Sequence, residues 1–61
     1  MMIFFELHLS DNNEKIMLNT DHINSIYQTE GTTNIYVGKV VYQVRESYDD
    51  IAKVIEKYYN A

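Results

Sequence analysis

A two-residue turn at Gly38-Lys39 separates two alternating apolar segments, and it limits how this part of the chain can fold. Gly at the first central position of such a turn adopts the positive φ of a type II′ hairpin without steric cost. The turn pairs Val37 with Val40, and the register of the whole hairpin follows from that pair. The segment therefore predicts two antiparallel strands over residues 33–37 and 40–45.

Side chains alternate across a strand, so the hairpin has two distinct faces. The face expected to pack on the core carries Ile35, Val37, Val40, Tyr42 and Val44. The opposite face carries Asn34, Tyr36, Val41, Gln43 and Arg45. The Tyr36–Val41 pair makes this second face more apolar than an ordinary solvent face, which favours contact with another chain.

Residues 48–59 predict an amphipathic helix. Ser47 precedes it as an N-cap, because its hydroxyl can accept from free N–H groups of the first turn. Asp49 and Asp50 place negative charge at the positive end of the helix dipole. Apolar residues recur at the i, i+3, i+4, i+7 spacing of a buried face, and these are Ile51, Val54, Ile55 and Tyr58.

The N-terminal half predicts a second hairpin. Strands over 2–9 and 15–19 flank the polar cluster Asp11-Asn12-Asn13-Glu14, which is typical of a turn. Thr20-Asp21 is expected to cap one helical turn before a strand over 25–29, which Glu30-Gly31-Thr32 closes. The chain thus predicts one α+β domain, residues 1–61, in which a small antiparallel β-meander of four to five strands packs on one C-terminal α-helix.

The chain is short for an independent fold. A domain of 61 residues buries only about 60% of its unfolded surface. Cysteine is absent, which excludes disulfides and thiolate metal sites, while 46% of the residues are hydrophobic. We therefore expect a homo-oligomer, most simply a dimer. The predicted interface residues are Met2, Phe4, Tyr36, Val41 and Tyr59.

The sequence predicts no membrane partner. Its longest apolar run covers residues 1–5, whereas a spanning helix needs roughly 20. The basic region and long apolar stretch of a signal peptide are also missing. We expect a cytoplasmic protein.

Candidate catalytic groups are sparse. His8 and His22 are the only histidines, and neither has the neighbouring ligands that a metal site requires. No nucleophile or phosphate-loop motif is present. We predict no enzyme activity and no catalytic, cofactor-binding or metal-binding residues. An enzyme or metal site, as the alternative, would use His8, Glu6 and the Asp49–Asp50 acids.

The net charge of −4 argues against strong binding to nucleic acid, since such affinity depends on neutralising phosphates. The five basic residues are scattered along the chain. A weak nucleic-acid-binding protein using the 33–45 hairpin face is still an alternative, because aromatic side chains stack on bases. The residues for that role are Tyr36, Lys39, Gln43 and Arg45.

Several segments resemble a known family. Residues 18–26, Leu-Asn-Thr-Asp-His-Ile-Asn-Ser-Ile, resemble the Leu-Asn-x-x-x-Ile-x-x-Ile segment of the small flagellar-operon FlbD family. Residues 33–39 and 44–51 resemble its hairpin and the Val-x-Glu-Ser start of its helix. The likeness covers residues 16–55. The chain departs from the family at 30–32, where Pro-Asp-Thr is usual, and at 10–13, where Leu-Asn-Gly is usual.

The resemblance implies a short β-rich chain with a C-terminal helix and no established catalytic residues. Similar short chains also occur on phages and mobile elements. Our preferred hypothesis is a non-catalytic, small oligomeric protein-interaction or regulatory module with an unidentified protein partner. One version is a phage or mobile-element protein that acts on a host protein, since an acidic surface suits a basic target.

Overall fold

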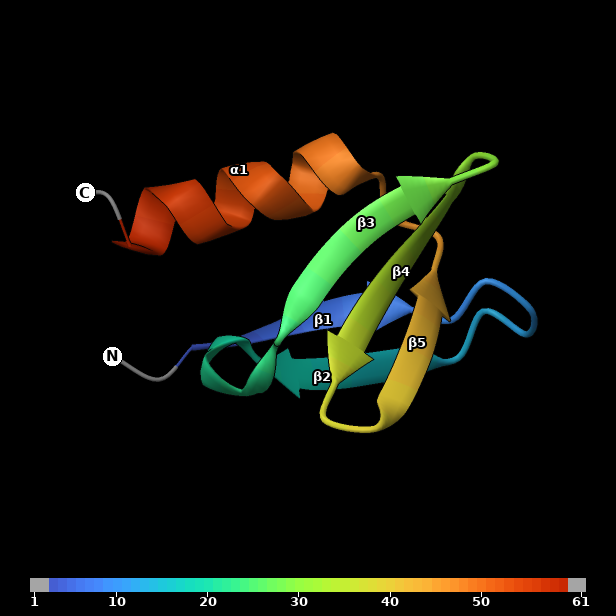
Figure 1. Ribbon diagram of the computed structural model, residues 1–61, viewed down its shortest axis with the longest axis horizontal. Helices are drawn as coiled ribbons and strands as arrows, with labels where there is room; N and C mark the ends of the chain where they lie inside the picture. Colours follow the sequence, from blue (N-terminus) through green and yellow to red (C-terminus); the bar gives the residue numbers. More distant parts are fainter. Residues whose placement is uncertain (1–2, 60–61) are drawn as a thin grey trace.

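The computed structural model describes residues 3–59, without the side chain of Tyr59. Figure 1 shows five strands and one long helix. The elements are β1 (Phe4–His8), β2 (Lys15–Asn19), the 3-10 helix η1 (Thr20–His22), β3 (Ser25–Thr29), β4 (Thr32–Val37), β5 (Val40–Val44) and α1 (Tyr48–Tyr59). The α+β class, the antiparallel strands and the C-terminal helix are as predicted.

The strands form two sheets rather than one continuous meander. β1 pairs with β2, and β3-β4-β5 form the second sheet. Helix η1 interrupts the chain between them, and the side chain of Asn19 caps it by accepting a 2.9 Å hydrogen bond from the Asp21 N–H. The cap is thus Asn19, where the sequence predicted Thr20-Asp21, because an Asx side chain bonds its own backbone two residues on.

The two sheets meet at one corner. Leu9 leaves β1 and forms an isolated antiparallel bridge with Val44. Two backbone hydrogen bonds flank the bridge, from the Ser10 N–H to the Gln43 carbonyl at 2.9 Å and from the Arg45 N–H to the His8 carbonyl at 2.8 Å. β1 therefore ends at His8 rather than at residue 9, since Leu9 pairs with a different strand. Met2 lies outside the described residues.

The β4–β5 hairpin has the predicted register. Val37 pairs with Val40, Tyr36 with Val41, Ile35 with Tyr42 and Thr33 with Val44. Gly38 has a φ of 60° whereas Lys39 does not have a positive φ, which is the pattern of a type II′ turn. The side chain of Asn24 accepts a hydrogen bond from the Gly38 N–H and ties the turn to the start of β3.

The β3–β4 hairpin closes through a tighter turn than expected. Thr29 pairs directly with Thr32, so only Glu30 and Gly31 form the loop. Their φ values are 51° and 79°, which is the conformation of a type I′ turn. Gly31 adopts this φ freely, but Glu30 is a non-glycine residue held in the left-handed region.

Helix α1 has the predicted bounds and cap. The Ser47 hydroxyl accepts a 3.1 Å hydrogen bond from the Asp50 N–H. Ile51 is only 1% exposed, and Val54 and Ile55 are half-buried. Tyr58 is 46% exposed, so its predicted place in the core is wrong. The last turn of α1 extends beyond the strands in Figure 1, where no sheet covers its lower face.

The core lies between the two sheets and the helix. Its buried members come from every layer, and they are Leu7, Leu18, Ile35, Val44 and Ile51. Val40 was predicted on this face but is 50% exposed, because it follows the turn at the end of the sheet. Within residues 3–59, no helix is long and apolar enough to cross a membrane.

Substitution of Glu30 by Asn is expected to stabilise the protein by about 0.5–1 kcal/mol. Asn tolerates the left-handed conformation, and Asn-Gly is the preferred pair for a type I′ turn. Urea denaturation at neutral pH measures the change. Glu30→Gln is the control, because it removes the same charge without relieving the backbone, and it should leave stability within about 0.5 kcal/mol. An E30N variant no more stable than E30Q would contradict the assignment of strain to Glu30.

Candidate interaction surface

One face of the three-stranded sheet points away from the core, and we call it the outer face of β3–β5. Its side chains come from all three strands and are Tyr27, Asn34, Tyr36, Val41 and Gln43. In the register, Tyr27 pairs with Asn34, and Tyr36 pairs with Val41. The alternation that directs Ile35 into the core directs these side chains outward.

Two tyrosines contact each other on the outer face. The Tyr27 and Tyr36 rings are tilted by 31°, with centroids 5.5 Å apart, and their hydroxyl oxygens are 3.0 Å apart. The hydrogen bond with Tyr36 raises the pKa of the Tyr27 hydroxyl above its ordinary value, and burial adds to this effect. The higher pKa favours the neutral hydroxyl of Tyr27, whose ring is 43% exposed on the outer face.

Asn34 and Gln43 lie beside the tyrosines on the same face and bond each other. Asn34 is only 3% exposed. Its Nδ2 donates to the Thr32 carbonyl at 3.2 Å and to the Tyr27 carbonyl at 3.5 Å, and its Oδ1 accepts from Gln43 Nε2 at 3.3 Å. These hydrogen bonds fix the side chains of Asn34 and Gln43 in the unbound chain. Such fixed side chains lower the entropic cost of binding.

The outer face ends at an apolar edge. Val41 is 41% exposed, and the neighbouring Val40 is 50% exposed. A groove of about 320 Å³ runs along this side of β5, and its walls come from the strand and from the loop that follows β1. The residues lining it are Leu9, Ser10, Asp11, Val41, Tyr42 and Gln43.

The structure brings together two of the five predicted interface residues, Tyr36 and Val41. Phe4 is 54% exposed but lies in the other sheet. There it shares the outward face of β1–β2 with Met17, which is 59% exposed. Met2 and the side chain of Tyr59 lie outside the described part of the chain. Sequence reasoning missed Tyr27, although it stands two residues from the start of a predicted strand and in register with the hairpin.

The predicted nucleic-acid residues divide between the outer face and its two ends. Tyr36 and Gln43 lie on the face itself. Lys39 lies in the turn before β5, whereas Arg45 follows β5 and donates from Nη1 to Asn13 Oδ1 at 2.9 Å. The two cations are thus separated by the length of the strand and do not form one basic patch.

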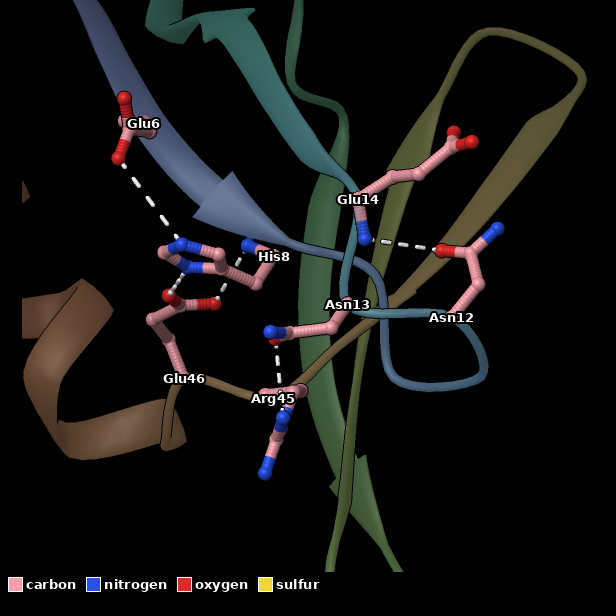
Figure 2. A network of polar contacts seen from close by, with 7 residues as sticks. All are labelled: Glu6, His8, Asn12, Asn13, Glu14, Arg45 and Glu46. Carbon is pink, nitrogen blue, oxygen red and sulfur yellow. Dashed lines mark hydrogen bonds and ion pairs between the residues drawn. The ribbon is translucent and has the colours of Figure 1, made fainter.

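A polar network lies at the corner where the sheets meet (Figure 2). Glu46 accepts a 2.9 Å hydrogen bond from the His8 backbone N–H, and its other oxygen is 2.7 Å from His8 Nδ1. Glu6 Oε2 is 4.0 Å from His8 Nε2. Asp49 and Asp50 are exposed at the helix start and are not part of this network.

Glu46 directly precedes the helix cap Ser47, and the fold directs its side chain to His8. The two residues are 38 positions apart, so no local pattern could reveal the contact. Burial raises the pKa of Glu46, but the hydrogen bonds from the His8 side chain and backbone lower it more, and the net pKa lies below the ordinary value. Among residues 3–59, no group of three or more His, Cys, Asp or Glu side chains is placed to hold a metal ion.

Comparison of the chain with models of protein families, with curated proteins and with solved structures finds no match. The resemblance to the FlbD family therefore stays a prediction from short motifs.

Substitution of Glu46 by Gln is expected to reduce the loss of stability in acid. The pKa of Glu46 is lower in the folded chain than its ordinary value of 4.5, so the unfolded state binds more protons as the pH falls. The stability that ionised Glu46 contributes is fully present above its ordinary pKa. This stability is lost as the pH falls through the lower pKa of the folded chain. Urea unfolding from about pH 7 to about pH 3 measures it.

The control for that experiment is Glu56→Gln on the exposed side of α1, which removes one charge away from His8. Wild type and E56Q should lose more stability in acid than E46Q does. If the free energy of unfolding of E46Q fell with pH in parallel with that of wild type, the Glu46–His8 contact would not favour the ionised carboxylate.

Proposed function

We propose that this chain is a non-catalytic protein-interaction module that self-associates through the outer face of β3–β5. The observation that carries the proposal is the ordered apolar strip of Tyr27, Tyr36 and Val41. It is partly exposed, and hydrogen bonds within the sheet hold its tyrosines in place. Tyrosine is enriched at protein interfaces, where a rigid ring provides contact area at little entropic cost.

The size of the core supports self-association. Only five apolar residues are buried in the described part of the chain, whereas seven large apolar side chains are exposed. Burial of one such side chain contributes about 1.5–3 kcal/mol. A small domain without a disulfide gains much of its stability from a second copy, and the simplest arrangement uses the same patch on both subunits.

The regulatory part of the proposal concerns a second kind of partner. The net charge of −4 gives the remaining surface a field that favours a basic protein. A role on a phage or mobile element, with a host protein as the target, fits this charge. The predicted likeness to the FlbD family fits a small regulatory chain equally well.

The nucleic-acid alternative uses the same aromatic face. It predicts base stacking on Tyr36 with Lys39 and Arg45 holding phosphates. The separation of the two cations and the acidic total charge favour the protein-interaction proposal. Retardation of a single-stranded probe at low salt in a gel-shift assay would favour nucleic acid instead.

Sedimentation of the full chain at micromolar concentration is expected to give twice the mass of a single chain. Val41→Lys should shift the protein to the monomer, because it places a charge on the exposed strip, while circular dichroism should show a retained fold. Met17→Lys is the matched control, since Met17 is more exposed than Val41 but lies on the other sheet. A folded wild-type monomer would contradict the proposal, as would a dimer lost in M17K and retained in V41K.

A further inference from the structure

The edge of β5 carries backbone groups that point away from the sheet. In an antiparallel pair, hydrogen bonds to the neighbouring strand come from alternate residues. In this register, the backbone N–H and C=O groups of Val40, Tyr42 and Val44 point toward β4. Val41 and Gln43 therefore direct theirs to the opposite side, and the bond from Ser10 to the Gln43 carbonyl shows this direction. The N–H and C=O of Val41 lie on that edge, where no strand pairs with them among residues 3–59.

The Val41 end of this edge lacks the usual protection against pairing, whereas Ser10 already bonds the edge at Gln43. Natural edge strands are blunted by charged residues, proline or a covering element. Strand β5 reads Val-Val-Tyr-Gln-Val, without charge or proline. In Figure 1 the opposite edge strand, β3, runs beside α1. Ile26 of β3 and Ile55 of α1 both line one hollow. Among residues 3–59, no helix or strand pairs with the Val41 end of β5 on the side of the groove.

We propose that a second copy of this chain pairs with β5 in antiparallel orientation, about a two-fold axis at Val41. This inference rests on the proposed self-association, but it places the second copy at the β5 edge of the outer face rather than over the face itself. A residue that faces its own copy across such an axis exchanges both hydrogen bonds with it. Each Val41 N–H then donates to the Val41 carbonyl of the other copy, and the two three-stranded sheets become one.

Charge complementarity supports a second copy as the occupant. Pairing centred on Val41 brings Lys39 of one copy opposite Gln43 of the other. Asp11 lines the groove beside Gln43, and both ionisable side chains are exposed. Each Lys39 ammonium thus approaches the Asp11 carboxylate of the other copy, and the two-fold axis repeats this contact. An ion pair at the rim contributes more to register and partner choice than to affinity.

The loop after β1 sets the length of the pairing. Ser10 already bonds the Gln43 carbonyl, so the second copy pairs only along Val40–Tyr42. Any slip of the register would drive the Gly38-Lys39 turn into Ser10 or away from it. Edge pairing also places the Val41 side chains of both copies side by side on one continuous outer face, which buries the apolar end of the strip.

Reversal of the two charges tests the geometry. In a D11K homodimer two pairs of cations face each other, and in a K39E homodimer two pairs of anions do. Each variant alone should dimerise about tenfold more weakly than wild type, or worse. An equimolar mixture restores opposite charges at both contacts, so it should form a heterodimer with affinity close to that of wild type. Sedimentation and native mass spectrometry of the single variants and the mixture measure this.

Amide hydrogen exchange provides a second measurement on the unaltered protein. The Val41 amide should exchange more slowly as concentration rises, because dimerisation places it in a hydrogen bond. The Gln28 amide is the internal control, since the register directs it to the outer side of β3. Protection of Gln28 in place of Val41 would overturn the proposal.

The outcomes separate the two proposals. A wild-type monomer overturns both. A wild-type dimer whose affinity is unchanged by D11K and by K39E, with no preference for the mixture and no protection of Val41, overturns edge pairing and leaves self-association through the outer face standing. Weak single variants with a restored mixture support the two-fold pairing at Val41.

Discussion

The bridge between Leu9 and Val44 holds the two sheets together, and the core forms in the angle beside it. Val44 is 2% exposed, and Leu7, two residues before the bridge, is 1% exposed. An isolated two-stranded hairpin is marginal in water, so β1–β2 needs the second sheet and α1 to cover its apolar side. Ile51 of the helix completes the enclosure. The β1–β2 hairpin therefore depends on the rest of the fold for its stability.

Polar contacts reinforce the same corner. Glu46 lies between β5 and α1, and its two bonds to His8 attach the start of the helix to the end of β1. Arg45 and Asn13 connect the strand end to the loop. One end of β5 is thus held on both sides, while the end near Val41 is paired only with β4. Among residues 3–59, strand β5 meets the end of β1 only at the Leu9–Val44 bridge. For this reason one end of β5 is covered and the end near Val41 is not.

Local patterns predicted most of the elements. The glycine at position 38 and the alternation around it were sufficient for the β4–β5 register, since turn geometry sets register within a hairpin. Ser47 and the spacing of Ile51, Val54 and Ile55 were sufficient for the bounds of α1. The errors occurred where neighbours distant in sequence decide exposure. Val40 and Tyr58 follow the apolar pattern, but they lie past the ends of the layers that would bury them.

The sequence by itself determined which segments are strands and helix and which side chains share a face, because those properties depend on residues only a few positions apart. Only the tertiary structure decided that the strands divide into two sheets, that Glu46 meets His8, and that Phe4 lies in a different sheet from Tyr36 and Val41. These contacts join residues separated by a turn or by most of the chain. These contacts depend on the angle at which the two hairpins cross over the shared core. No periodicity along the sequence predicts that angle.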